Sequence, residues 1–236
     1  MAPPAPRKLR DSVAPTRDET LSVALEIIDR DGAAGLSMRR LGNALGCDPM
    51  SLYRHAATKA ALLDLVADVV LSELSVDVSD ADWEAQLRQL ARQFRRVALA
   101  HPNVVPLLVT RPLTIPISMW PSGALRLLED VLELLERAGF SEVDALRIYR
   151  LVYGSMQGHV LNELQRLVTN HEETDPLLRL GLHRLSLREF PRLRHLAPVL
   201  AAYDGPDELE RRMDIMLTGL QIELHPTESG AAPSLA

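Results

Sequence analysis

Residues 36–63, LSMRRLGNALGCDPMSLYRHAATKAALL, constrain the fold more than any other stretch of the chain. Gly46 follows the expected end of a short helix, where a glycine tolerates a left-handed backbone. Asp48 can cap the next helix, and Pro49 suits its first position because no backbone N–H is needed there. The pattern predicts two short helices joined by a tight turn. The second carries polar and aromatic side chains, which is typical of a helix-turn-helix that reads DNA.

A first helix is predicted before this segment. Thr16 and Glu19 have the spacing of a capping box, which marks a helix start. Gly32 and Gly35 are expected to end this helix, and its apolar face is expected to contain Leu21, Ala24, Leu25 and Ile28. Residues 1–15 are rich in proline and basic residues, so we expect a disordered tail. The alternative is a basic arm that touches DNA phosphate or the minor groove.

The second and fourth helices have their own caps. Ser37 can cap the second helix, whose inner positions are expected to be Leu41, Ala44 and Leu45. Thr58 can cap a fourth helix that runs to about residue 74. In the third helix Leu52 is expected to face inward. Met50 and Arg54 are four residues apart and are expected to share the outer face.

The chain is expected to stay helical beyond a polar segment at residues 75–82. The longest helices are predicted at about 84–100, 122–138, 141–168 and 207–224. No alternation rich in Val, Ile and Thr suggests strands, so an all-α protein is expected. Residues 226–236 are expected to be a disordered tail.

Charge is distributed unevenly along the chain. The formal net charge is −6, but residues 1–60 hold nine Lys and Arg against seven Asp and Glu. This balance fits a DNA reader attached to an acidic body. A single cysteine, the lack of a secretory signal and the lack of a long apolar run together favour a cytoplasmic protein that does not enter a membrane.

Side chains on and around the third helix suit a DNA groove. Arg54 could donate to guanine or phosphate, and Met50 could contact a thymine methyl group. Arg39 and Arg40 could reach the same groove, and the helix start at Thr58 favours a phosphate oxygen. The predicted DNA-binding residues are Ser37, Arg39, Arg40, Pro49, Met50, Ser51, Tyr53, Arg54, His55, Thr58 and Lys59.

At these residues the sequence resembles the TetR family of transcriptional repressors. The resemblance covers residues 17–74 and rests on Gly35-Leu36-Ser37, Leu45-Gly46, the Ser51-Leu52-Tyr53-x-His55 run, Lys59 and Leu62-Leu63. It implies that Arg39 stands where Tet repressors read a guanine. It also implies base-proximal roles for Met50, Ser51 and Arg54 and phosphate contacts for Tyr53, His55 and Lys59. The chain departs from the Tet repressors at Pro49-Met50 and at Arg54, so a different operator is expected.

The resemblance also implies the domain organisation. A helix-turn-helix three-helix domain at 16–60 is joined by the helix at 58–75 to a ligand-binding and dimerisation domain at 61–225. The helices at 141–168 and 207–224 are expected to pair across a homodimer, where Gly154 and Gly158 permit close approach. The alternative is that they pack only within one chain. A dimer would bind a palindromic, double-stranded DNA operator and release it when a small molecule binds.

The effector pocket is expected within the C-terminal helices, for a largely apolar ligand of medium size. The candidate residues are His101, Asn103, Leu107, Thr110, Arg111, Met119, Trp120, Tyr149, Tyr153, Met156, Gln157 and Asn162. Leu107 and Asn162 stand where the Tet repressors have a metal-binding histidine and an acidic residue. This argues against a magnesium–tetracycline effector, and neither a cofactor nor a metal is predicted.

Other classes of protein are less well supported. The seven histidines lack a close metal-ligand spacing, and there is no glycine-rich phosphate loop or nucleophile elbow, so no catalytic residue is predicted. Cys47 is expected to be a small packed residue. A helical protein-interaction module without DNA remains an alternative, and a transcriptional activator is the alternative to a repressor.

Overall fold

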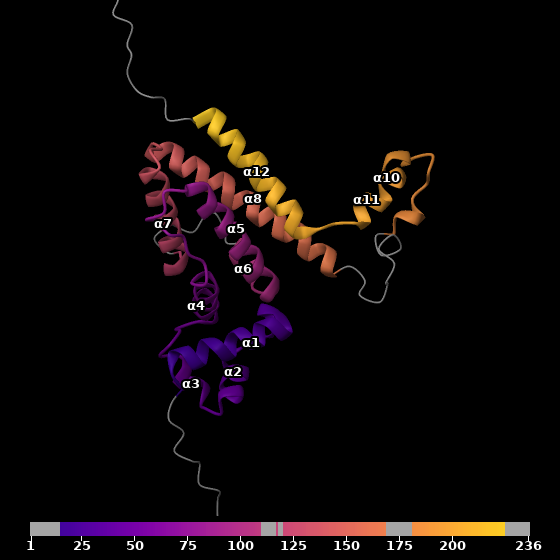
Figure 1. Ribbon diagram of the computed structural model, residues 1–236. Coiled ribbons are helices and arrows are strands. Elements are labelled where there is room, and N and C mark those ends of the chain that lie inside the picture. The colour runs from indigo at the N-terminus through magenta and orange to yellow at the C-terminus, as the bar shows by residue number, and fades with distance from the viewer. Residues whose placement is uncertain (1–14, 110–116, 118–119, 169–180, 225–236) are drawn as a thin grey trace, which may run out of the picture. The chain divides into compact units, whose positions relative to one another are not determined.

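The computed structural model describes residues 15–109, 117, 120–168 and 181–224, and these residues contain helices and turns but no strand (Figure 1). The expected all-α class is therefore confirmed. Contacts divide the chain into two compact units, one of residues 1–73 with 101–125 and one of residues 74–100 with 126–236. The predicted boundary between residues 60 and 61 stays a prediction. None of the described helices is long and apolar enough to cross a membrane.

The first unit contains α1 (Arg17–Gly35), α2 (Met38–Leu45), α3 (Pro49–Leu52), α4 (Lys59–Leu71) and α6 (Val105–Val109). All four predicted caps are present: each side chain of Thr16, Ser37, Asp48 and Thr58 accepts a hydrogen bond from a backbone N–H in the first turn that follows it. Gly46 ends α2 with φ +66°, and Gly32 interrupts α1 with φ +71°. A side chain rarely adopts these backbone angles, so glycine is needed at both positions.

The core of the first unit contains most of the residues that periodicity selects. Leu21, Ala24 and Ile28 on α1 are buried, as are Leu41, Leu52 and Leu62. Ala44 was expected to face inward, but it is exposed and Gly42 is buried instead. A Cβ at Gly42 would lie 3.0 Å from the Cys47 carbonyl oxygen and from Pro49 Cγ. The turn therefore packs directly on the backbone of α2, and that close approach determines which face is inside.

The third helix is shorter than expected. It ends at Leu52, and Tyr53, Arg54 and His55 form a turn. Met50 and Arg54 therefore do not share a helix face, and that expectation is wrong. The fourth helix also ends early, at Leu71 rather than near residue 74.

The second unit contains the long helices. These are α5 (Trp83–Ala100), α7 (Ser122–Arg137, of which residues 126–137 belong to this unit), α8 (Glu142–Val168) and α12 (Gly205–Leu224). Shorter helices are η2 (Leu182–Arg184), α10 (Pro191–His195) and α11 (Ala197–Ala201). All four predicted long helices are confirmed within two residues at each end. Gly139, with φ +94°, makes the turn between α7 and α8.

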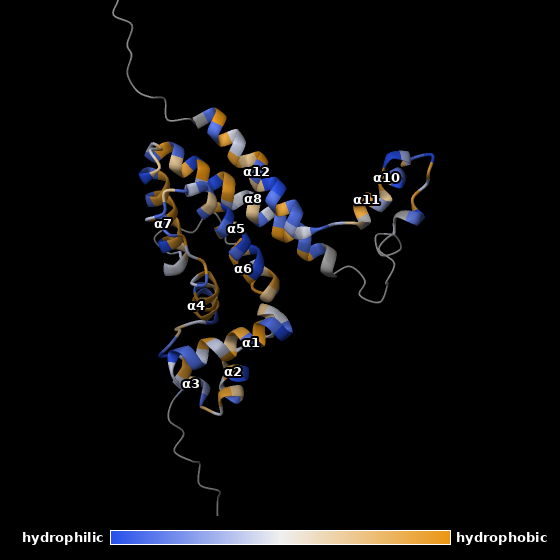
Figure 2. Cartoon of the chain, in the orientation of Figure 1, coloured by the Kyte–Doolittle hydropathy of each residue, from blue (hydrophilic) through white to orange (hydrophobic). Residues whose placement is uncertain are grey.

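Helices α5, α8 and α12 pack against one another and enclose the core of the second unit (Figure 1). Hydrophobic and hydrophilic residues are interspersed along α8 and α12 (Figure 2), and the buried apolar residues of each helix recur three or four positions apart, as an amphipathic helix requires. The buried residues include Leu87, Leu90, Phe94, Ile148, Val152, Leu209, Met213 and Leu217. Arg92 on α5 forms a two-pronged ion pair with Glu210 on α12, at 2.5 and 2.8 Å. This pair connects the two helices at the edge of the core.

Candidate nucleic-acid interface and effector cavity

Helix α3 presents large side chains that no core packing explains. Met50 is 70% exposed and Tyr53 is 44% exposed, whereas Leu52 between them is 1% exposed. The Asp48 carboxylate accepts from the Met50 N–H at 2.9 Å, and the Ser51 hydroxyl donates to the Asp48 carbonyl at 2.6 Å. These bonds hold a four-residue helix that would otherwise fray. The outer face of α3 is therefore exposed and held by local hydrogen bonds, and its size and side chains suit a DNA groove.

The two arginines of α2 have different environments. Arg39 is exposed. Arg40 forms an ion pair with Asp31 and donates to the Gly35 carbonyl at 3.2 Å, so it connects α2 to the end of α1. The Arg30 guanidinium and then the Arg40 guanidinium lower the pKa of the Asp31 carboxyl. Of the two arginines, Arg39 is better placed to donate to DNA.

Arg54 and His55 lie beside the start of α1. Arg54 Nη2 donates to the Pro15 carbonyl oxygen at 2.7 Å, and His55 Nε2 lies 3.0 Å from the same oxygen. From the sequence, both side chains were expected to contact DNA, and their contact with Pro15 was not expected. Pro15 lies 39 positions before Arg54 and 40 positions before His55.

The start of α4 offers donors to a phosphate. The Thr58 hydroxyl oxygen accepts from the Ala61 N–H at 3.0 Å, which leaves its hydroxyl hydrogen as a donor. Lys59 is exposed in the first turn. A helix N-terminus with an exposed lysine favours an anion.

A small apolar cavity lies in the second unit and contains three of the twelve predicted effector residues: Tyr149, Tyr153 and Met156. Seven further residues line it: Leu74, Leu87, Leu90, Phe94, Leu127, Val131 and Val152. Sequence reasoning did not select these seven. The spacing of Leu87, Leu90 and Phe94 along α5 is the signal that could have indicated them.

Aromatic rings form one wall of the cavity. Tyr149 and Tyr153 stack with centroids 5.6 Å apart and an interplanar angle of 8°. Phe94 meets Tyr153 edge to face at 6.1 Å. Burial, together with the neighbouring Tyr153, raises the pKa of the Tyr149 phenol, which stays neutral and keeps its proton for donation. The cavity has room for only about 10 Å³ of solvent, so a larger occupant requires the surrounding helices to move.

The other predicted effector residues that the structure describes do not line this cavity. His101 Nδ1 lies 2.8 Å from Asp29 Oδ2, and Asn103 donates to the Asp29 carbonyl at 2.8 Å, so both contact α1 of the first unit. Leu107 and Trp120 are half-buried in the first unit, while Gln157 is half-buried and Asn162 is exposed on α8. Thr110, Arg111 and Met119 lie outside the described residues.

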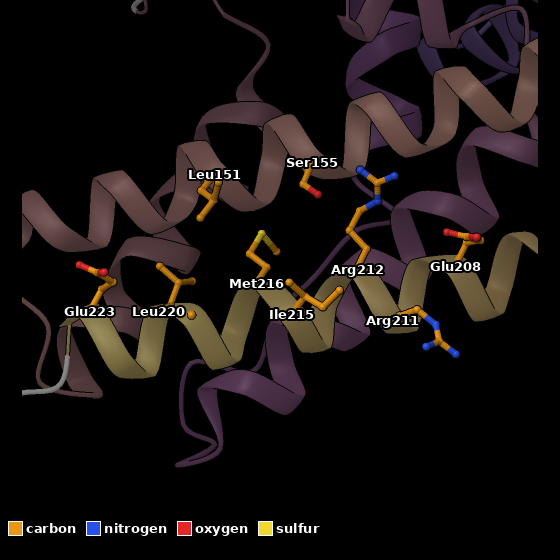
Figure 3. Close-up of a pocket in the computed structure, with 10 residues that line it drawn as sticks. Leu151, Ser155, Glu208, Arg211, Arg212, Ile215, Met216, Leu220 and Glu223 are labelled. Carbon is orange, nitrogen blue, oxygen red and sulfur yellow. The ribbon is translucent and has the colours of Figure 1, made fainter. Parts of the chain in front are cut away.

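A groove follows the outer surface of α8 and α12 (Figure 3). Leu151 and Ser155 on α8 face Met216, Leu220 and Arg212 on α12, whereas Arg211 points away from α8. The groove is mostly apolar, and Ile215, which is 71% exposed, lies along it. A Cβ at Gly154 or Gly158 would meet nothing within 4 Å, so this part of α8 leaves open space beside its backbone.

A buried ionic cluster lies within the second unit. Arg95 on α5 donates twice to the Glu163 carboxylate on α8, at 2.9 and 2.6 Å. His159 is 1% exposed, and its Nε2 atom lies 3.5 Å from Glu163 Oε2 without a hydrogen-bond partner among the described residues. Burial is the main cause that lowers the pKa of His159, and Glu163 opposes this effect. Arg212 and Arg95 lower it further, and Glu208 raises it.

Family comparisons agree with this arrangement. The family described as "Tetracyclin repressor-like, C-terminal domain" matches residues 77–224, and "Bacterial regulatory proteins, tetR family" matches residues 21–66. The chain belongs to the TetR family. Members of this family are DNA-binding regulators rather than enzymes. None of the described residues forms a group of three His, Cys, Asp or Glu that could hold a metal ion.

Individual proteins resemble the chain over 63% to 92% of its length. An HTH-type transcriptional regulator of Saccharopolyspora erythraea is 38% identical over 63% of the chain and 61% of that protein. The HTH-type transcriptional repressor DrrR1 of Streptomyces coeruleorubidus is 33% identical over 63% of the chain and 54% of that protein. The matched part of the chain thus spans less than two thirds of either relative. ActR of Streptomyces coelicolor, solved in complex with actinorhodin, is 28% identical with a TM-score of 0.73, over 92% of the chain and all of ActR.

Proposed function

We propose that this TetR-family chain is a ligand-responsive transcriptional repressor. It binds a palindromic operator in double-stranded DNA as a homodimer, and a small-molecule inducer releases it. The exposed residues of α3 and of the turn after it carry this proposal, because Met50 is exposed on a short helix that Asp48 caps and Tyr53 is exposed directly after that helix. Large, partly apolar side chains of this kind are better accommodated in a DNA groove than in solvent. The repressor assignment draws on DrrR1, which is named a repressor.

Arg39 and Met50 read bases in this proposal, and Tyr53, Thr58 and Lys59 bind phosphates. Arginine can donate two hydrogen bonds to the O6 and N7 atoms of guanine, and a thioether can contact a thymine methyl group. Phosphate contacts set the register of the helix but carry no sequence information.

The effector occupies the Tyr149–Tyr153 cavity, and we propose a planar, largely apolar molecule. A flat ring system of the ligand can stack on the two parallel phenol rings of Tyr149 and Tyr153. A relative, ActR, is solved with the small molecule actinorhodin, which supports a pocket in this type of chain. Since the unliganded cavity is nearly closed, binding must separate α5, α7 and α8. That movement gives the effector different affinities for two conformations, which is the requirement for allosteric release.

The homodimer forms through the groove on α8 and α12. The exposed apolar residues Leu151, Ile215 and Ile222 and the open backbone at Gly154 and Gly158 favour a second pair of the same helices. A two-fold interface of this kind presents two reading helices to two half-sites.

Selection of bound sequences from a random DNA pool at fixed salt tests the proposal. We expect an inverted repeat with half-sites separated by a whole number of helical turns. Recovery of no motif would contradict DNA reading, and recovery of a single half-site would contradict the dimer. Planar aromatic compounds that raise the melting temperature should lower operator affinity by the same factor by which operator lowers theirs.

A further inference from the structure

The start of α12 lies against an ion pair that joins two other helices. Arg95 on α5 donates from Nε and Nη2 to the two carboxylate oxygens of Glu163 on α8, at 2.9 and 2.6 Å. Gly205, the first residue of α12, is buried beside this pair. A Cβ at Gly205 would overlap Glu163 Oε1 and would lie 3.1 Å from Arg95 Nη2. The carboxylate therefore packs on bare backbone, and one ion pair contacts three helices.

The surroundings of the pair keep the carboxylate in this position. The side chain of Glu163 is 10% exposed and that of Arg95 is 21% exposed. Two charge-assisted hydrogen bonds compensate the carboxylate for its loss of water, so leaving them is costly. A negative charge beside the first turn of a helix is also favoured by the helix dipole. Glu163 thus attracts the start of α12 to α8.

His159, one turn before Glu163 on α8, can disturb this arrangement. It is 1% exposed, and its Nε2 atom lies 3.5 Å from Glu163 Oε2 without a hydrogen-bond partner in the described part of the chain. The other charged groups that act on it are Arg95 on α5 and Arg212 and Glu208 on α12. While the imidazole is neutral, two arginines face two carboxylates. A proton on His159 adds a third cation, which competes with Arg95 for Glu163.

The same charges reach the groove on α8 and α12. Glu208 and Arg212, in the first two turns of α12, line this groove (Figure 3). Arg212 faces Ser155, one turn before His159 on α8. A shift of the first turns of α12 therefore changes the apolar surface on which the proposed homodimer depends.

We propose that Glu163 is a positioning residue that holds the start of α12 on α8, and that a proton on His159 releases it and weakens the homodimer. The second part rests on the proposed dimer interface. Burial, the main cause, lowers the pKa of His159 below 6.5, so the neutral imidazole is favoured while α12 is in place. The separated chains then bind the proton more readily than the dimer does, and dimer affinity falls as the pH falls below about 6.5.

Amide hydrogen exchange on the full chain tests the anchor in any oligomeric state, because it reports local opening. At about pH 7.5, the first turn of α12 should exchange about 10-fold faster in Glu163→Gln than in the wild type, the effect of losing one hydrogen bond to a charged group. Gly205→Ala should do the same without a change of charge, because its Cβ displaces the carboxylate. The last turn of α12 is the internal reference and should be unchanged.

The proton release is tested by repeating the exchange at about pH 5.5, where histidine is largely charged unless its surroundings prevent it. The wild type should then open the first turn of α12 faster than His159→Gln at the same pH, where the chemical exchange rate is equal. His183→Gln, at an exposed histidine of the same unit, is the matched control and should follow the wild type.

Sedimentation equilibrium at both pH values measures the effect on the homodimer. Between about pH 7.5 and about pH 5.5, the dimer dissociation constant of the wild type should rise about 10-fold more than that of His159→Gln. That factor corresponds to a difference of about one pKa unit between the dimer and the separated chains. Melting temperatures of all variants at both pH values exclude global unfolding as the cause.

Each part of the inference has its own contrary result. Wild-type exchange rates in Gly205→Ala and Glu163→Gln would overturn the anchor. Equal pH dependence of exchange and of dimer dissociation in the wild type and His159→Gln would overturn the proton release. A wild-type chain that is monomeric at about pH 7.5 but shows the expected exchange differences would contradict the proposed homodimer and support the anchor.

Discussion

At the scale of single residues, the exposed cations of the helix-turn-helix region are expected to have separable roles. Arg39→Ala should cost about 1–3 kcal/mol of specific binding and relax specificity at one operator position, because arginine pairs with guanine.

Lys59→Ala should weaken binding to all sequences evenly and reduce the slope of log affinity against log salt concentration by about 1, because the lysine neutralises a phosphate. Titrations of operator and scrambled DNA measure both effects. Equal losses on both DNAs for Arg39→Ala would contradict base reading.

His159 gives the chain a predicted pH dependence. Burial lowers the pKa of His159 below its ordinary value of 6.5, so the unfolded chain binds a proton more readily than the folded one. The stability from the neutral imidazole is present above about pH 6.5 and is lost as pH falls towards the folded-state pKa. His159 faces Glu163 on its own helix, Arg95 on α5, and Arg212 and Glu208 on α12.

Urea unfolding of the wild type and His159→Gln from pH 8 to pH 5 measures this dependence. The wild type should lose more stability than the variant below about pH 6.5. Parallel curves over the whole range would show that His159 does not titrate differently in the two states. His183→Gln, at an exposed histidine of the same unit, is the control and should follow the wild type.

At the scale of secondary-structure elements, the close approach between α2 and the turn depends on Gly42. A Cβ there would lie 3.0 Å from the Cys47 carbonyl oxygen and 3.1 Å from the Pro49 nitrogen, both of which are backbone atoms. Gly42→Ala should therefore destabilise the first unit by about 1–3 kcal/mol, as overpacking does. Asn43→Ala, at the exposed neighbouring position, should change stability by less than about 0.5 kcal/mol. A Gly42→Ala chain as stable as the wild type would show that the turn can move away.

Local pattern predicted these elements well. Caps, glycines with positive φ and apolar spacing act within a few residues, so the limits of α1, α2, α5, α7, α8 and α12 agree with expectation. The end of α3 did not follow from the sequence. Neither a glycine nor a proline lies between Leu52 and His55 to mark the end of the helix. In the folded chain the Arg54 guanidinium donates to the Pro15 carbonyl, a contact that requires the turn after α3 to lie beside the start of α1.

At the scale of the whole molecule, the groove on α8 and α12 should control the oligomeric state. Ile215→Asp places a charge in an interface that must bury apolar surface, so the chain should become monomeric. Operator affinity should fall with it, because the two half-sites are no longer bound together. Light scattering and operator titration measure the two effects.

The same substitution at a different exposed residue serves as the control. Val143 on α8 is 59% exposed and does not line the groove, so Val143→Asp should remain dimeric and bind operator. Dimers in both variants would show that the chain associates through another surface.

Residue type and spacing were enough to predict the helical class, the caps and limits of most helices, and the helix-turn-helix with its exposed Met50 and Tyr53. These features depend on interactions between residues close together in the chain, which a local pattern describes. The partners of Arg54, Arg40 and His101, and the meeting of α5 and α8 around the Tyr149–Tyr153 cavity, became visible only in the folded chain. The contacts of those three side chains join residues up to 72 positions apart. Packing of whole helices determines them, and no local pattern encodes which surfaces will meet.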